Sequence, residues 1–376
     1  MPFTLIPQNS ISGGVGDSLR TNAKPLIING DMAVAQRGTS FVSEGEQYTL
    51  DRFYYEKNND AVVTITQEAL TSGNAYKDGF SSALKVDVTT ADTNFTTNQR
   101  AYIEHTIEGQ DLQLVKKGTS DAEKLTLAFW VKATKTGTNV VRIDANDSGR
   151  VCSQSYTISS SDTWEKKVLN FPADTTGVIN NDNGKGLRIT WGMASGTNYT
   201  SGTLATTWEA ETDANTFVGQ VNNFDSASNN FHITGIQLEV GEYTSSTIPP
   251  FQHESYGDNF LRCQRYCQQF NHDATGGNET QVGIGWAYNS SSIYGFKDLV
   301  IPMRTQPTMS SLSGTNYYRT HNNNTAQTFN QIGFNASSTK SFWIFNAGTF
   351  SGLATNQIRT VEIVNANGYV RADAEL

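Results

Sequence analysis

Short runs of alternating apolar and polar residues recur along the first two thirds of the chain. Within residues 82–88, for example, Leu84, Val86 and Val88 alternate with polar neighbours. A period of two is the pattern of a strand that is buried on one face. Similar runs occupy residues 61–67, 82–88, 125–132, 140–144, 164–171, 187–191 and 231–240. Clusters of Gly, Asn, Asp and Thr separate them, so the pattern predicts many short strands in a sandwich or jelly roll.

One segment, residues 255–270, has a helical period. Its apolar residues fall at alternating steps of four and three, at Tyr256, Phe260, Cys263, Cys267 and Phe270. Ser255 can cap the amino end. The stripe either packs on the chain's own domain or meets copies of itself on a threefold axis. We favour the first alternative because the stripe is only two heptads long.

Strand-like runs resume after this helix and predict a smaller second β-domain. They occupy residues 281–287, 294–301, 341–345 and 358–364. The expected fold is all-β, with an amino-terminal arm (1–24), a jelly-roll sandwich (25–254), a linking helix (255–270) and a carboxy-terminal β tip domain (271–376). The arm, rich in Gly, Ser and Asn, either docks on another protein or is disordered.

Charged residues make up only 17% of the 376 residues, and the formal net charge is -9. The surface must therefore be made polar largely by uncharged side chains, which suit self-assembly and contacts with sugars. An acidic chain without clusters of Lys and Arg is a poor binder of nucleic acid. No apolar run approaches the roughly 20 residues that span a bilayer. The first residues lack the pattern of a secretory signal, so we expect synthesis in a cytosol.

Candidate catalytic groups are few. The chain has none of the common hydrolase, zinc-protease or phosphate-loop motifs, and we expect no enzymatic activity. Glu209 and Glu211, near Trp208, are the best pair of carboxylates for glycoside hydrolysis, but a polar strand edge is the favoured interpretation. Cys263 and Cys267 lack the spacing of a usual metal site.

Two pairs of sequence boxes carry a resemblance to a known family. Residues 28–38 read I-N-G-D-M-A-V-A-Q-R-G and are followed by Y-T-L-D-R-F at 48–53. Residues 233–241 read I-T-G-I-Q-L-E-V-G and are followed by R-C-Q-R-Y at 262–266. Together they resemble tail-fibre and other virion proteins of tailed phages. Phe53 stands where that family usually has Trp, and Cys267 where a second Tyr is more typical.

The resemblance covers roughly residues 25–270 and implies a jelly-roll domain similar to carbohydrate-binding modules. We expect the opening segment 28–34 and the closing segment 233–240 to be its first and last strands and to pair or face each other. It implies a structural virion component, and a tail fibre or adhesin that contributes to recognition of host-surface glycan is the favoured member. A head decoration, head fibre or adaptor without receptor binding is the alternative, and a glycan-depolymerising tailspike is a weaker one. The expected partners are two further copies in a homotrimer, other tail or virion proteins, and host cell-surface polysaccharide.

Aromatic residues in loops are the candidates for contact with sugars. Tyr199 and Trp208 flank a loop rich in Gly, Ser and Thr, and Tyr317, Tyr318 and His321 lie in an Asn-rich segment. In each case packing in a core, or a trimer contact, is the competing interpretation.

Two further aromatic residues, Tyr294 and Trp343, sit in strand-like runs of the tip and are expected in its core. A structural Ca²⁺ is the one cofactor considered, because jelly-roll binding modules often hold one. Asp31 in the opening box and Glu239 in the closing box are its candidate ligands. A turn cap for Asp31, and a pair with Arg37 or Arg52 for Glu239, are the alternatives.

Overall fold

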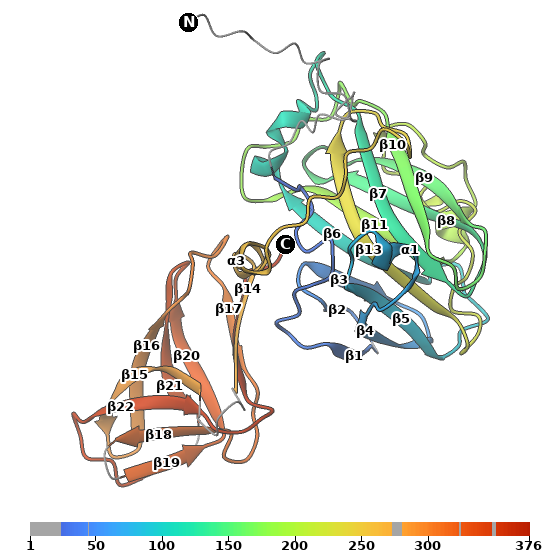
Figure 1. Ribbon diagram of the computed structural model, residues 1–376. Helices are drawn as coiled ribbons and strands as arrows, with labels where there is room; N and C mark the ends of the chain where they lie inside the picture. Colours follow the sequence, from blue (N-terminus) through green and yellow to red (C-terminus); the bar gives the residue numbers. More distant parts are fainter. Residues whose placement is uncertain (1–23, 44, 273–279, 323–324, 348–350) are drawn as a thin grey trace, which may run out of the picture. The chain divides into compact units, whose positions relative to one another are not determined.

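The structure, a computed structural model, describes residues 24–43, 45–272, 280–322, 325–347 and 351–376. The chain divides into two compact units, Met1–Ser255 and Tyr256–Leu376. Each unit is built from antiparallel sheets and has a hydrophobic core of its own (Figure 1). The expected all-β class is confirmed.

The first unit is a jelly-roll sandwich of two sheets. One sheet has the order β1-β4-β5-β13-β7-β10 and the other β12-β9-β8-β11-β6-β3-β2. The strands of the first sheet are β1 (Ser40–Ser43), β4 (Val62–Ala69), β5 (Ser82–Thr90), β7 (Leu125–Ala133), β10 (Glu165–Phe171) and β13 (Asn230–Val240). Those of the second are β2 (Gln47–Tyr48), β3 (Phe53–Lys57), β6 (Arg100–Glu108), β8 (Gly137–Ala145), β9 (Arg150–Ile158), β11 (Lys185–Ser195) and β12 (Glu209–Ala210).

The inward faces of the two sheets form one core. In β5, Leu84, Val86 and Val88 are buried there, as their alternation predicts. Short helices lie in the connections: α1 (Gly73–Lys77), α2 (Thr197–Thr200), η2 (Gly109–Val115), η3 (Asn146–Ser148) and η4 (Asp213–Asn215). The strands are thus committed to packing on one side, and their other side is available for a binding surface.

The opening and closing boxes are in contact, as expected if they belong to one structural feature. The backbone N–H of Ile236 in β13 donates to the oxygen of Gly30 at 2.9 Å. Residues 28–34 form turns and not the expected strand, because Asn29 has a left-handed backbone with φ 61° and bonds Val34 through its side chain. Asp51, from the second box, accepts hydrogen bonds from the backbone and side chain of Gln36. Hydrogen bonds of the buried Asn29 and Asp51 side chains therefore hold the irregular backbone of the opening box against the sandwich.

The second unit also contains two sheets, ordered β14-β23-β17 and β19-β18-β22-β15-β16-β21-β20. Its helix is α3 (Tyr256–Gln264). Its strands are β14 (Cys267–Asn271), β15 (Thr280–Asn289), β16 (Ser292–Asp298), β17 (Thr308–Ser311), β18 (Tyr318–Asn322), β19 (Thr325–Phe329), β20 (Gln331–Ser337), β21 (Ser341–Ala347), β22 (Ile358–Ile363) and β23 (Tyr369–Asp373).

The expected linking helix over 255–270 is wrong in its second half. The helix ends at Gln264, and Cys267 to Asn271 pair instead with Asp373 to Tyr369 of β23. The helix belongs to the second unit. Pairing with a strand about a hundred residues away outweighed the local helical preference. Such long-range pairing is not visible in the local pattern of apolar residues. The expected arm lies almost wholly outside the described residues.

Cys152, Cys263 and Cys267 are free and buried. In the part of the chain that the structure describes, every helix is too short or too polar to cross a membrane.

Candidate functional site

A pocket opens on the outward face of the seven-stranded sheet of the sandwich. Alternate residues of β6, Arg100, Tyr102 and Glu104, point to this face because the intervening residues face the core. Strand register sets their neighbours: Glu56 of β3 lies opposite Tyr102, and Thr190 of β11 lies opposite Glu104. The next row places Arg188 opposite Asp144 of β8. Four strands therefore bring charged side chains from distant segments together.

Arg100 is fixed at one side of the pocket. Its Nε and Nη2 donate to one oxygen of Glu56 at 3.1 and 2.8 Å, and its Nη1 donates to the Tyr199 hydroxyl at 2.7 Å. The guanidinium also lies 5.6 Å from the ring centroid of Tyr102 and 5.3 Å from that of Tyr199. It thus ties strand β3 to helix α2 and holds the Tyr199 ring at the pocket.

Glu104 lies on the pocket floor and is almost fully buried. Arg188 Nε is 3.4 Å from its carboxylate, and the Thr190 hydroxyl donates to it at 3.3 Å. Burial raises the pKa of Glu104 to about 7, against the opposing effect of the Arg188 cation. Glu104 therefore exchanges a proton near neutrality.

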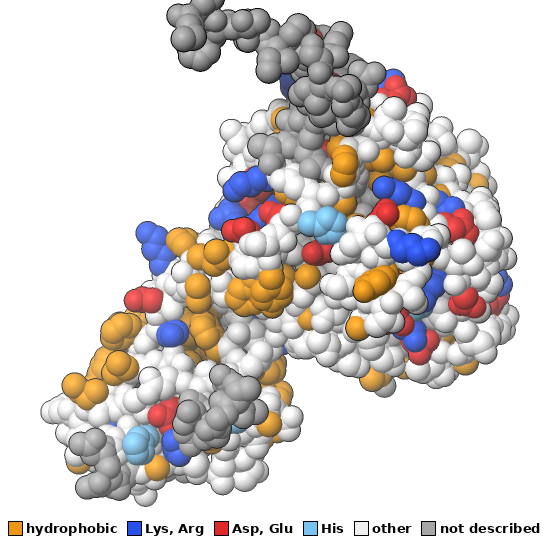
Figure 2. All heavy atoms as spheres, viewed as in Figure 1, with side chains coloured by type: hydrophobic (Ala, Val, Ile, Leu, Met, Phe, Trp, Pro, Cys, Tyr) orange, Lys and Arg blue, Asp and Glu red, His pale blue; other side chains and the backbone are white. Residues whose placement is uncertain are grey.

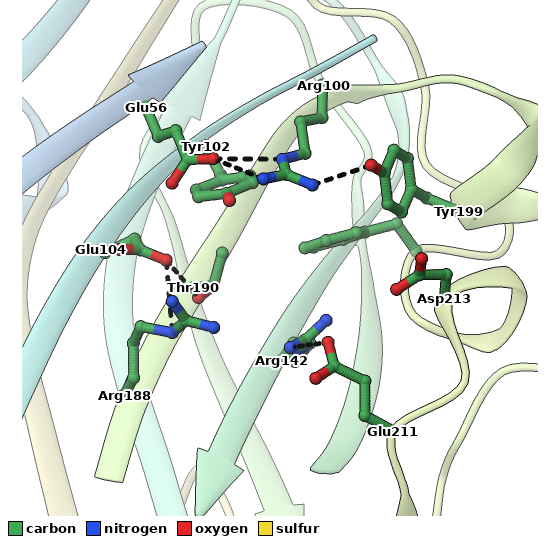
Figure 3. A pocket seen from close by; sticks show the side chains of 11 residues that line it. Glu56, Arg100, Tyr102, Glu104, Arg142, Arg188, Thr190, Tyr199, Glu211 and Asp213 are labelled. Carbon is green, nitrogen blue, oxygen red and sulfur yellow. Dashed lines mark hydrogen bonds and ion pairs between the residues drawn. The ribbon is translucent and has the colours of Figure 1, made fainter. Parts of the chain in front are cut away.

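The opposite wall is made by Arg142 of β8. Its guanidinium pairs with Asp144 on the same strand and with Glu211, whose side chain is about half exposed. Figure 3 shows Arg188 with Glu104 on one side of the opening and Arg142 with Glu211 on the other. The walls are thus lined by ion pairs of arginine and carboxylate. Each pair retains N–H donors and carboxylate oxygens that can form hydrogen bonds with a polar ligand.

Aromatic rings complete the pocket. Phe217 stacks on Tyr102 with centroids 6.2 Å apart and planes at 16°. Gly192, beside Tyr102 in the sheet, leaves room for this ring, because a Cβ there would meet Phe217 at 2.8 Å. The cavity has a volume of about 140 Å³, which is more than one water needs. Rings beside paired donors and acceptors suit a sugar, whose ring has apolar faces and a rim of hydroxyl groups.

A second, wider hollow of about 630 Å³ lies in the same unit. It is lined by Phe80, Trp130, Phe251 and His253, among others. Phe251 packs edge-on against Phe80 with centroids 4.9 Å apart, and the Trp130 indole donates to Asp78 at 3.2 Å. This hollow is broader and less polar than the pocket at Arg100. Its hydrogen-bonding groups are therefore less concentrated around one ligand position.

The structure separates the two candidate aromatics of the sandwich. Tyr199 lines the pocket. Trp208 is buried: its indole donates to the oxygen of Pro172 at 2.7 Å, and the Lys117 ammonium lies 3.8 Å from its ring centroid. The interpretation of Trp208 as an exposed ring for sugar contact is wrong, because the Lys117 side chain and the chain around Pro172 cover it. Of the two candidate carboxylates, Glu211 reaches the pocket, whereas Glu209 accepts a bond from Asn215.

The candidates in the tip also differ from one another. Tyr318 is a core residue whose hydroxyl lies 2.8 Å from the oxygens of Leu312 and Tyr369, and Tyr317 packs partly buried against the same core. His321 lies in strand β18, not in a loop, and lines a hollow on the outward face of the larger sheet. Trp343 and Tyr294 were both expected in the core. Trp343 is instead 44% exposed, because its neighbours Phe342 and Ile344 take the inward positions of β21. Tyr294 also lies on the outward face, because Ile293 takes the inward position beside it.

The two proposed calcium positions remain a prediction. Asp31 accepts a bond from the Ala33 N–H at 3.4 Å, and Glu239 is buried in β13. Across the described ranges there is no cluster of three or more His, Cys, Asp or Glu side chains suited to a metal. A rise in unfolding temperature on adding Ca²⁺ would support the site.

The sequence alone did not point to several residues of the pocket, among them Arg100, Tyr102, Glu104, Arg142 and Arg188. Their signal is the placement of charged residues and Tyr at alternate positions, with apolar residues between them, as in the run R-A-Y-I-E of β6. That pattern marks an outward face, but only strand register shows that these faces meet.

Comparison with known proteins does not place the chain in a family. Neither a family model nor a curated protein matches it. Among solved structures, a putative sugar binding protein from Bacteroides thetaiotaomicron is 15% identical and aligns over 58% of this chain and 100% of its own, with a TM-score of 0.31. A family 11 carbohydrate-binding module from Clostridium thermocellum is 13% identical over 59% of this chain and 99% of its own, with a TM-score of 0.27.

The enzymatically active domain of tailspike protein 4 from bacteriophage CBA120 is 15% identical over 50% of this chain, with a TM-score of 0.29. The match spans 19% of that protein's chain. Similarities of this size assign no function to the present chain.

Proposed function

We propose that this protein is a non-enzymatic structural component of a tailed-phage virion, a tail fibre or adhesin that binds host-surface glycan in the pocket of its sandwich. The pocket carries the glycan-binding part of the proposal: Tyr102, Tyr199 and Phe217 place ring faces beside Arg100 and Glu211 in one recess. The virion part rests on the resemblance of the sequence boxes.

The chemistry of the pocket favours a polar ligand that carries many hydroxyl groups. Its arginines and carboxylates are mutually paired, so a strongly charged ligand would have to break existing ion pairs. A sugar can instead accept from the guanidinium groups and donate to the carboxylates without displacing either partner.

Glycan binding is tested on an array of bacterial surface oligosaccharides with the full chain. Tyr199→Ala and Glu211→Ala should each weaken binding roughly tenfold, since each removes one hydrogen-bonding or stacking partner. Matched controls are Tyr76→Ala, on exposed helix α1, and Glu242→Ala, in an exposed pair with Lys124. Equal losses in the controls, or no glycan bound by the parent chain, would contradict the proposal. Release of shorter sugars from a bound glycan would contradict the non-enzymatic assignment.

The place of the protein is tested separately. Its detection in purified tails by mass spectrometry would support a fibre or adhesin, whereas detection in heads alone would favour the head-decoration alternative.

We also propose a homotrimer, because threefold appendages are built from threefold proteins and closed symmetry covers exposed sheet edges. Light scattering of the full chain at micromolar concentration should give three times the chain mass of 41.2 kDa. A monomer under these conditions would argue against it.

A further inference from the structure

The second unit carries a cluster of aromatic side chains on the outward face of its larger sheet. Trp286 of β15 lies opposite Tyr294 of β16, and Phe296 of β16 lies opposite Trp343 of β21. The ring centroid of Trp286 lies 6.3 Å from that of Tyr294 and 6.0 Å from that of Trp343. Strands β15, β16 and β21 thus present one continuous aromatic surface.

This surface is exposed to a degree unusual for such residues. The fractional exposure of Ile284, Tyr288, Phe296, Trp343 and Ile358 ranges from 44% to 74%. Figure 2 shows hydrophobic side chains gathered along the flank of this unit where Figure 1 labels β16 and β22. Since the core of the unit lies on the other face of the sheet, these side chains add nothing to it. A contiguous apolar patch of this kind marks a surface that binds something.

The aromatic surface leads into a hollow of about 400 Å³. Ile284 and Ile358 form its apolar wall, and His321, Asn322 and Thr360 supply polar groups. Register aligns His321, Thr360, Ile284, Phe296 and Trp343 in one row across β18, β22, β15, β16 and β21. At about 4.8 Å between strands, this row is roughly 19 Å long.

The row contains no acid, lysine or arginine, although the chain as a whole has a net charge of -9. The hollow combines an apolar wall with the neutral hydrogen-bonding groups of His321, Asn322 and Thr360, which suits a small polar ligand. Arg359 also lines it, but its Nε donates to the buried Thr320 hydroxyl at 3.0 Å. A second copy packed on this face would have to fill the hollow with side chains of its own to reach the packing density of a protein interior.

We propose that this outward face of the second unit is a carbohydrate site for neutral sugar rings, separate from the charged pocket of the sandwich. Sugar rings lie on Phe296, Trp343 and Trp286, and their hydroxyl groups bond to His321, Asn322 and Thr360. The inference rests on the proposed glycan-binding function and adds a second site, in which aromatic rings and neutral hydrogen-bonding groups take the place of the ion pairs of the sandwich pocket.

The test uses the full chain on an array of neutral hexose and deoxyhexose oligosaccharides. Trp343→Leu and Phe296→Leu keep apolar area but remove the ring faces, and His321→Leu removes a hydrogen-bonding group. Each should weaken neutral-glycan binding roughly tenfold. Tyr256→Leu, an exposed aromatic on α3 of the same unit, should not. Tyr199→Ala, in the sandwich pocket, should leave these neutral glycans bound.

Three results would overturn the proposal. If the Leu variants bind all glycans as the parent does while Tyr199→Ala loses them, the second site is wrong and the sandwich site stands. If the parent binds no glycan on this neutral array, the second site is wrong; if it also binds none of the bacterial surface oligosaccharides, both proposals are wrong. If the Leu variants change only the oligomeric state, the face contacts a second copy.

A measurement on the unaltered chain guards against variants that fail to fold. Saturation of aromatic protons by NMR should transfer to the ring protons of a bound neutral oligosaccharide, and the transfer should persist in Tyr199→Ala. Absence of transfer in both proteins would overturn the second site.

Discussion

Individual residues of the sandwich pocket have properties that their sequence neighbours do not reveal. Glu104 is the clearest case, because β6, β8 and β11 together bury its carboxyl beside Arg188. The raised pKa, about 7 against a usual 4.5, means that the folded chain keeps a proton that the unfolded chain releases.

The sign of this linkage predicts a pH effect on stability. The stabilisation from protonated Glu104 is fully present below pH 4.5 and is lost as the pH rises through 7. Glu104→Gln mimics the protonated carboxyl, so the variant should keep this stabilisation as the pH rises. Relative to the parent, the free energy of unfolding of the variant should rise by on the order of 3 kcal/mol between pH 4.5 and pH 8. Urea unfolding at both values measures this difference.

Glu242→Gln is the control for this measurement, because its carboxylate lies in an exposed pair with Lys124. Its difference from the parent should stay nearly constant over the same range. A Glu104→Gln difference that is equally constant would show that the carboxyl stays ionised in the folded chain.

Single elements also depend on distant parts of the chain. Strand β13 has an irregularity between Thr234 and Gln237, where Gly235 takes a left-handed backbone with φ 62°. A Cβ at Gly235 would lie 2.6 Å from the ring of Phe80. This irregularity sits where Ile236 bonds Gly30, so it joins the opening segment to the last strand of the sandwich.

Gly235→Ala should therefore lower the free energy of unfolding by about 2–3 kcal/mol, through backbone strain and overpacking. Gly257→Ala is the matched control: Gly257 is in helix α3, and no atom lies within 4 Å of a Cβ placed there. Alanine there should raise stability by up to about 1 kcal/mol. Denaturant unfolding measures both, and an unchanged Gly235→Ala would mean that Phe80 moves aside freely.

Among the described residues of the whole molecule, the main core of the sandwich and the core of the second unit share no residue. Two such units need not unfold in one step. We expect calorimetry to resolve two transitions.

Phe342→Ala, in the core of the second unit, should lower one of these transitions by the equivalent of about 3–5 kcal/mol. Phe129→Ala, in the core of the sandwich, should lower the other. A single transition that both variants shift equally would show that the units unfold together.

The sequence by itself determined the elements whose pattern is local. The alternation in residues 82–88 and 125–132 predicted β5 and β7 closely, because an apolar residue at every second position is a property of the strand alone. The second β-unit and the contact between the opening and closing boxes were also predicted from the chain.

Tertiary structure alone decided what depends on pairing. The helix expected through Phe270 stops at Gln264 because β23 claims the following residues. Trp208 is covered by segments remote in sequence, while Trp343 faces outward because its neighbours fill the core. Both candidate sites are assembled by strand register, which places side chains from distant strands in one row. Register depends on long-range pairing energies, and a single strand's sequence does not contain them.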